Sequence, residues 1–348
     1  MRTKKILLVL TLIACLASPV FAAGASETKA APAADGPVVI SYYTWDDSSH
    51  KALIDTFNAT HKDIQVKAQI LPAADYETKL TTLLSGRADI DAFMEKRQVD
   101  MFGQYDNGYL EPLDSYIAAT GKPNPAVEAF KSSSVINGDT VVIPWRGGAY
   151  YTYYNKKVFE KAGVPTPDYY VKRGEWTWKK FEEVAKAITA ADPSLVGSTI
   201  YIWGGQGFFQ AGQAGDSIVT PDGKIDNIDN VVKQLEMRKR LEDVGAMWSL
   251  VDMKVTKLHY SKQFYDGNVG MLLIGEWFPG QMVTGRNDGL LAYDFEDWGI
   301  TRLPCDQKEY VTVGLPTGNC ITSYSKKKQA AFEFINWMSG PEGAAIAA

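Results

Sequence analysis

Aromatic and polar side chains stand next to each other at several points where the sequence predicts the end of a strand. Two aspartates follow Trp45, Arg146 follows Trp145, and Glu276 precedes Trp277. An indole ring offers a flat apolar face and one N–H donor, while a carboxylate or a guanidinium makes several strong hydrogen bonds. These pairs favour the binding of a small ligand with an apolar face and a polar edge. The residues selected on this basis are Trp45, Asp46, Asp47, Glu95, Trp145, Arg146, Tyr151, Trp203, Glu276 and Trp277.

Several of these residues also have a purely structural interpretation. Asp46 and Asp47 can cap the helix that follows them, and Glu95 begins a charged run that solvent would cover. Tyr151 belongs to a run of tyrosines in which alternate side chains face the core, so only one face of the strand can meet a ligand. Trp203, in the short segment YIWGG, is predicted to end a strand. The sequence leaves both interpretations open.

Charge and histidine content argue against other kinds of site. The formal net charge is −5, because 41 acidic residues outnumber 36 basic ones. Phosphate neutralisation needs a basic face, so no nucleic-acid partner is expected. The chain has three histidines, His50, His61 and His259, and lacks the G-x-S-x-G, H-E-x-x-H and P-loop motifs. We therefore expect a binding protein that has no catalytic residue, no bound metal and no cofactor.

The elements that must position these residues alternate between strands and helices. Strands are predicted over 38–45, 64–71 and 89–94, with helices after the first two of them, and this β-α-β-α-β order indicates a parallel sheet. Further strands are predicted over 141–145, 149–154 and 269–274, and amphipathic helices over 177–190, 229–243 and 327–339. Because this is more than one hydrophobic core comfortably holds, the pattern predicts two α/β lobes.

The N-terminus has the features of a secretory signal. In residues 1–22 a basic start precedes an apolar run of about 12 residues, which is too short to span a bilayer. Residues 23–36 are small and non-periodic and read as a flexible tether. Alternatively, Leu12–Cys15 resembles a lipoprotein signal, in which Cys15 would carry a lipid anchor. Either way, the sequence predicts an exported protein that is periplasmic or otherwise extracytoplasmic.

Export bears on the cysteines. Apart from Cys15, the chain holds Cys305 and Cys320. In an oxidising compartment such a pair is a disulfide candidate, and the alternative is two buried free thiols.

Five blocks, in this order along the chain, resemble the extracellular solute-binding proteins of bacterial ABC importers, in the sugar-binding group of the maltose-binding protein family. The blocks are Tyr76–Leu80 with the acidic pair Asp89 and Asp91, Gly108–Asp114, the long stretch Asn137–Phe181, Phe264–Trp277, and Ser325–Gly343. Two departures stand out. The segment GRADIDAFM lacks the proline that usually precedes its aspartate, and the chain stops at Ala348, where family members continue. We therefore expect that a C-terminal part of the fold is missing.

The resemblance implies a two-lobed periplasmic-binding-protein type II fold of the α/β class, with the ligand cleft between the lobes. It places residues 37–147 and 316–348 in lobe 1 and residues 148–315 in lobe 2. The chain would cross between lobes near 147–149 and return near 311–315. Closure of the lobes on the ligand as a hinge is the expected motion.

The function implied by the resemblance is delivery of a carbohydrate to the membrane permease of an ABC importer by a monomeric binding protein. Sugars combine apolar C–H faces with hydroxyls, which suits the aromatic and polar pairs selected above. A sugar derivative such as a polyol is also compatible. Two alternatives are a secreted carbohydrate-active enzyme and a ferric-iron binder that uses neighbouring tyrosines such as Tyr150–Tyr151 and Tyr169–Tyr170.

Overall fold

A first sheet combines strands from both ends of the chain. The computed structural model describes residues 36–45, 48–73, 75–216, 218, 224–314 and 316–347. Strands lie in the order β2-β1-β3-β11-β6. Their bounds are β1 (Val38–Trp45), β2 (Ile64–Leu71), β3 (Ala92–Glu95), β6 (Ile143–Arg146) and β11 (Thr317–Ile321). β1 pairs in parallel with β2 and β3, as the alternating pattern predicts, whereas β11 runs antiparallel between β3 and β6. The carboxyl ends of β1, β3 and β6 therefore share one edge of the sheet.

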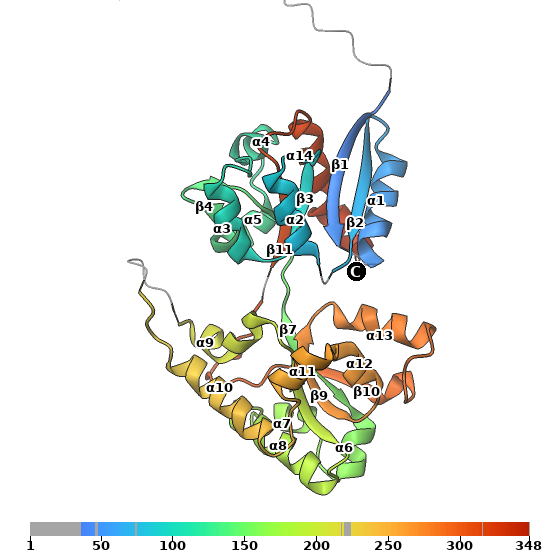
Figure 1. Ribbon diagram of the computed structural model, residues 1–348, viewed down its shortest axis with the longest axis vertical. Helices are drawn as coiled ribbons and strands as arrows, with labels where there is room; N and C mark the ends of the chain where they lie inside the picture. The colour runs from blue at the N-terminus through green and yellow to red at the C-terminus, as the bar shows by residue number, and fades with distance from the viewer. Residues whose placement is uncertain are drawn as a thin grey trace, which may run out of the picture. The chain divides into compact units, whose positions relative to one another are not determined.

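Helices pack around this sheet and build its core (Figure 1). The core centres on Tyr42, Phe57, Phe93 and Phe334, which are fully buried. The surrounding elements are α1 (Ser48–Thr60), α2 (Tyr76–Ser85), α3 (Gln98–Asp106), α4 (Asp114–Ala119), α5 (Pro125–Ala129), η1 (Lys131–Ser133), the hairpin β4 (Val135–Ile136) and β5 (Asp139–Thr140), α14 (Lys328–Met338) and α15 (Pro341–Ala347).

A second sheet has the strand order β10-β7-β9-β8. Its strands are β7 (Tyr150–Asn155), β8 (Val196–Ile200), β9 (Val269–Gly275) and β10 (Trp298–Arg302). β8 and β9 are parallel, while β7 runs antiparallel to β9 and to β10. The start of β7 thus lies beside the end of β9, where Tyr150 pairs with Gly275.

Hydrophobic clusters cover both faces of the second sheet. Tyr150 and Tyr154 belong to one cluster and Tyr153 to another, so alternate tyrosines of β7 enter different cores, as the sequence predicts. The surrounding elements are α6 (Lys156–Ala162), α7 (Pro167–Lys172), α8 (Trp178–Ala191), η2 (Gly204–Phe208), α9 (Phe209–Ala214), α10 (Asp229–Glu242), α11 (Leu250–Thr256), α12 (Tyr260–Tyr265), α13 (Phe278–Asn287) and η3 (Phe295–Asp297).

The predicted helix over 177–190 shows why local sequence decides these elements. It is observed as α8, which buries Trp178, Phe181 and Ile188 on one face. The side chain of Thr177 accepts the N–H of Lys180 and satisfies a donor of the first turn. Among the described residues, no helix has the length and apolar content that crossing a membrane requires.

Two connecting segments join the sheets. Residues 147–149 lead from β6 to β7, and residues 303–316 lead from β10 to β11. The segments touch where Ala149 forms a bridge with Gly314 and the N–H of Tyr150 donates to the carbonyl of Val313 at 3.1 Å. A Cβ at Gly314 would lie 2.6 Å from the carbonyl oxygen of Gly147, so this close approach requires glycine at position 314.

Several expectations from the sequence need revision. The strand expected over 89–94 begins only at Ala92, because the Asp91 carboxylate accepts hydrogen bonds from the Ser41 N–H and the Ser325 hydroxyl. β8 ends at Ile200, so the prediction that Trp203 ends a strand is wrong; Trp203 precedes η2 instead. Residues 1–35, which include the expected signal peptide, Cys15 and most of the tether, lie outside the described residues.

The disulfide candidate Cys305–Cys320 is contradicted, because both cysteines are free and buried. Cys320 lies on β11 in the core of the first sheet, packed among its apolar side chains. Cys305 follows β10 of the second sheet. Its N–H donates to the carbonyl of Trp176, a residue of the core of that same sheet. The chain therefore follows the alternative interpretation of two separate buried thiols.

We predict that both thiols stay unmodified in the native protein and react only after unfolding. Burial shields them and raises the pKa of the Cys320 thiol, so little nucleophilic thiolate is present. Alkylation with iodoacetamide without reductant, before and after addition of guanidinium chloride, followed by peptide mapping, should label Cys305 and Cys320 only in the unfolded sample. A Cys305–Cys320 cross-linked peptide in the unreduced digest would contradict the structure.

Candidate functional site

The edge formed by β1, β3 and β6 gathers several of the selected residues. Trp45 ends β1, Glu95 ends β3, and Trp145 and Arg146 end β6. The start of β11 reaches the same edge, because Gly318 pairs with Glu95 and Thr317 with Arg146. Ligands of open α/β sheets bind beyond the carboxyl ends of strands, so this edge is a candidate binding surface. Asp46 and Asp47, which follow Trp45, lie outside the described residues.

Aromatic rings hold the edge residues in place. The buried ring of His50 on α1 lies between two indoles, 5.1 Å from that of Trp45 and 4.8 Å from that of Trp145. Trp45 itself is largely buried, whereas Trp145 is partly exposed. The guanidinium carbon of Arg146 lies 4.2 Å from the centre of the Trp145 ring, and Nη2 donates to the hydroxyl of Ser49 at 3.3 Å. Trp145 and Arg146 therefore form a preorganised pair with an apolar face and charged donors.

Glu95, the last residue of β3, is the most buried of the selected residues that the structure describes at this edge and is 3% exposed. Its Oε1 accepts the N–H of Arg97 at 2.8 Å, and its Oε2 accepts the side-chain amide of Gln104 at 2.7 Å. Burial raises the pKa of Glu95 to about 7, and the two hydrogen bonds oppose this rise. The carboxyl group is thus poised to change its charge near neutral pH.

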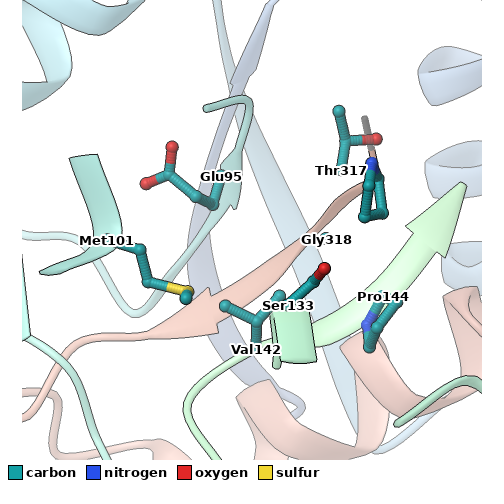
Figure 2. Close-up of a pocket in the computed structure, with 8 residues that line it drawn as sticks. Glu95, Met101, Ser133, Val142, Pro144, Thr317 and Gly318 are labelled. Carbon is teal, nitrogen blue, oxygen red and sulfur yellow. The ribbon is translucent and has the colours of Figure 1, made fainter. Parts of the chain in front are cut away.

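A small cavity of about 10 Å³ opens next to Glu95, which is about the space that one water molecule needs. Figure 2 shows Glu95 and Met101 on one side of this cavity and Pro144 and Thr317 on the other. The hydroxyl of Thr317, which lines the cavity, is buried and has no hydrogen-bond partner among the described residues. Because an unpaired buried polar atom is costly, a water or ligand hydroxyl in this cavity is its natural partner.

We predict that Glu95 lowers the stability of the protein as the pH rises from about 4.5 to about 7. In this window the folded protein keeps a proton that the unfolded chain releases, so the free energy of unfolding falls with pH, by roughly 3 kcal/mol in total. Glu95→Gln should remove this dependence, measured by urea unfolding at pH 5 and at pH 8. The exposed Glu128→Gln is the control and should behave like the wild type. An unchanged pH profile in Glu95→Gln would refute the prediction.

The second sheet carries an aromatic cluster at the ends of β8 and β9. The centre of the Trp203 ring lies 5.8 Å from that of Trp277, 5.2 Å from that of Tyr201 and 5.5 Å from that of Tyr260. Trp203 is 38% exposed and Trp277 is partly exposed, whereas Tyr260 is buried beneath them. The cluster therefore presents indole faces on a rigid aromatic base, which suits stacking against the apolar face of a ligand.

Trp277 is held more tightly than its partner. Its Nε1–H donates to the hydroxyl of Tyr260 at 3.0 Å, and its ring meets that of Tyr150 edge-on at 5.6 Å. Gly275 leaves room for the ring, since a Cβ there would lie 2.0 Å from Cζ3 of Trp277. The missing side chain at position 275 thus allows the indole to lie back against the end of β9.

We predict that Gly275→Ala displaces the Trp277 ring, because the added methyl group cannot share its space. Overpacking of this kind costs about 1–3 kcal/mol of stability. The indole N–H resonance of Trp277 should shift in two-dimensional NMR. Gly280→Ala on α13 is the matched control, because a Cβ there meets no atom within 4 Å and should leave the resonance in place. A Trp277 resonance at its wild-type position in Gly275→Ala would show that the ring does not depend on Gly275.

Two of the selected residues, Tyr151 and Glu276, lie beside residues of the aromatic cluster but differ from them in their contacts. Tyr151 alternates with Tyr150 on β7, and it is Tyr150 whose ring contacts Trp277. The carboxylate of Glu276 accepts the N–H groups of Gly148 and Ala149, so both of its oxygens are engaged with the connecting segment. Ligand contact by Tyr151 or Glu276 stays a prediction.

Sequence reasoning missed residues that support the aromatic rings. Tyr201, His50 and Tyr260 each contact a selected tryptophan, although their spacing from it in the chain does not mark them as supports of its ring. His259 stacks on Tyr260 with ring centres 4.1 Å apart and extends the cluster. The sequence offers one weak indication of these supports, which is the neighbouring pair His259 and Tyr260 at the start of a helix. Among the described residues, no group of three or more His, Cys, Asp or Glu side chains is arranged to hold a metal ion.

Comparison with known proteins assigns almost the whole chain to one family. Residues 43–345 match the family described as bacterial extracellular solute-binding proteins. A binding protein of Brucella abortus is 26% identical over 302 residues, which cover 81% of this chain and 66% of that protein. The chain thus spans slightly less than two thirds of the length of this curated relative.

Solved structures agree in fold. An ABC substrate-binding protein from Listeria monocytogenes, in complex with cycloalternan, is 27% identical with a TM-score of 0.73 and covers 89% of this chain and 77% of that one. A sugar transporter structure from Rhizobium etli, in an open conformation, is 25% identical with a TM-score of 0.69 and covers 89% and 78%. The fold is the two-lobed periplasmic-binding-protein type II fold expected from the sequence. The chain belongs to the family of bacterial extracellular solute-binding proteins.

Proposed function

We propose that this protein binds a carbohydrate, or a polyol of similar chemistry, outside the cytoplasm and delivers it to the permease of an ABC importer. The observation that carries the proposal is that each of the two sheets presents a surface at its strand ends that suits part of a sugar. One presents the exposed indole of Trp203 and the partly exposed indole of Trp277, and the other presents Trp145, Arg146 and Glu95. Family membership and the cycloalternan complex of the Listeria protein support the same ligand class.

In this proposal the two surfaces contact different parts of the sugar. The indoles of Trp203 and Trp277 offer flat apolar faces to the C–H face of a sugar ring, with the N–H of Trp277 already satisfied by Tyr260. The guanidinium of Arg146 lies against the Trp145 ring and presents its charge at the same edge, where a planar fork of N–H groups suits neighbouring sugar hydroxyls. Glu95 accepts hydroxyl donors most strongly when it is charged.

The protein is proposed to catalyse no reaction on its ligand. Glycoside hydrolysis needs two carboxyl groups free to act as acid and as base or nucleophile. Glu95 is engaged with Arg97 and Gln104, and Glu276 is engaged with the amides of Gly148 and Ala149. Both carboxyl groups are therefore used to organise the site rather than to react.

Release and delivery rest on motion of the lobes. Residues 37–147 and 316–348 form lobe 1 in this proposal, and residues 148–315 form lobe 2. The ligand favours the closed arrangement to the extent that it gains contacts there with both surfaces. The permease would then recognise the closed form of a monomeric protein. We further propose export through the signal in residues 1–22, with a lipid anchor at Cys15 as the alternative.

The function is tested by titrating tryptophan fluorescence with glucose, maltose, cellobiose, β-1,6-galactobiose and mannitol. A saturable change with one ligand class is expected, because nearby indoles report both stacking and closure. A protein that is folded by circular dichroism but responds to none of these ligands would argue against the proposal.

We predict that Trp277→Ala weakens binding of the responding ligand by at least about 10-fold, because it removes an aromatic platform worth more than about 1.4 kcal/mol. Isothermal titration calorimetry measures this loss. Trp337→Ala is the matched control. This partly exposed indole on α14 packs against Phe57 and His61, on the side of the first sheet away from the strand ends that hold Trp145. Equal losses in both variants would mean that Trp277 has no special role.

A further inference from the structure

Glu276 is tied to the connecting segment between β6 and β7 by three hydrogen bonds. Its Oε1 accepts the N–H of Gly148 at 3.0 Å, and its Oε2 accepts the N–H of Ala149 at 3.2 Å. Its own N–H donates to the carbonyl of Ala149 at 2.9 Å. The whole residue, backbone and side chain, is therefore committed to residues 148–149.

The segment that Glu276 holds is conformationally permissive. Gly147 and Gly148 are adjacent, and Gly148 has a φ of +63°, in the left-handed region that favours glycine. On the C-terminal side, Ala149 and Tyr150 are fixed to Gly314 and Val313 of the other connecting segment. Glu276 adds a charged acceptor for the two successive N–H groups where the permissive stretch ends. Residues 148–150 are thus held by hydrogen bonds and a bridge, and the permissive Gly147 lies directly before them.

Glu276 is also bonded directly to the indole platform, because Trp277 is the next residue. The Trp277 ring is fixed by Gly275 on one side and by the Tyr260 hydroxyl on the other. Because the two residues share a peptide bond, a displacement of Trp277 on ligand stacking would be passed to the main chain of Glu276. Glu276 in turn donates its own N–H to the carbonyl of Ala149, and its carboxylate accepts the N–H groups of Gly148 and Ala149.

We propose that Glu276 is a positioning residue that couples occupation of the Trp277 platform to bending of the β6–β7 connection, and that it does not contact the ligand itself. The inference rests on the proposed function, since it needs a ligand that stacks on Trp277. It assigns to Glu276 a role different from the ligand contact that its place beside Trp277 suggests. The carboxylate acts through the amides of Gly148 and Ala149.

The first test needs no ligand. Amide hydrogen exchange of Gly148 and Ala149 is measured by NMR in the ligand-free full chain, the Glu276→Gln variant and the Glu276→Ala variant. Hydrogen bonds to a charged acceptor protect strongly, so Glu276→Ala should speed exchange at both amides roughly 10- to 100-fold. Glu276→Gln should speed at least one of them, because its NH₂ group would face a donor.

A matched control separates this effect from general loss of stability. Asp192 also accepts a backbone N–H, that of Ser194 at 2.8 Å, and pairs with Lys161 at 2.6 Å, but it lies after α8 in the same half of the fold. Asp192→Ala should leave exchange at Gly148 and Ala149 unchanged. Faster exchange throughout the chain in Glu276→Ala, or wild-type exchange at both amides, would overturn the inference.

The second test uses whichever ligand of the fluorescence panel saturates the wild type. Small-angle scattering should show a decrease in radius of gyration on binding in the wild type and a smaller decrease in Glu276→Ala at saturation. Full compaction in the variant would overturn the coupling. Weaker binding by Glu276→Gln with wild-type amide exchange would instead mark Glu276 as a ligand contact. If no panel ligand binds the wild type, the proposed function fails and the coupling fails with it, while exchange still reports the Glu276 hydrogen bonds.

Discussion

The pairing of the two connecting segments is the constraint on which the rest of this structure depends. β6 runs into one segment and β11 emerges from the other, so their contact near Ala149 and Gly314 sets where the edge of the first sheet ends. The same contact sets the start of β7, beside which β9 must end because Tyr150 pairs with Gly275. Backbone groups make these contacts at distances that exclude a side chain at Gly314. Residues at both strand-end surfaces therefore take their positions from one short stretch of main chain.

The two surfaces contain apolar rings and one buried carboxyl group, and folding affects these two kinds of group in opposite ways. The indoles of Trp203 and Trp45 pack against the buried rings of Tyr260 and His50. Because these contacts form on folding, folding itself stabilises the orientation of the indoles. Glu95 is held by two donors while burial disfavours its charge, so its presence costs stability near neutral pH. Glu95 is thus a buried carboxyl group that weakens the fold near neutral pH and lines a small cavity, which is typical of a binding site rather than of a hydrophobic core.

Most of the fold that surrounds these surfaces could be predicted from local patterns. The strands over 38–45 and 64–71 and the helix α8 follow from alternation, from apolar residues on one face and from caps, all of which depend on neighbours in sequence. The insertion of β11 between β3 and β6 could not be predicted this way, because it brings together residues more than 170 positions apart. The separation of Cys305 from Cys320 follows from that same insertion, which buries one thiol in the first core and leaves the other with the second sheet.

The sequence by itself determined the α/β class, the family resemblance and most of the aromatic and charged residues that lie at strand ends, because a strand end is a local event. Only the tertiary structure decided which of those ends meet and what each side chain does there. Trp277 and Glu276 are sequence neighbours that were both selected as ligand contacts, yet the Trp277 ring lies on an aromatic base and the Glu276 side chain is bonded to the main chain of residues 148–149. The Glu276 carboxylate has its partners more than a hundred residues away, and the Trp277 N–H has its partner 17 residues away. No local pattern encodes either contact.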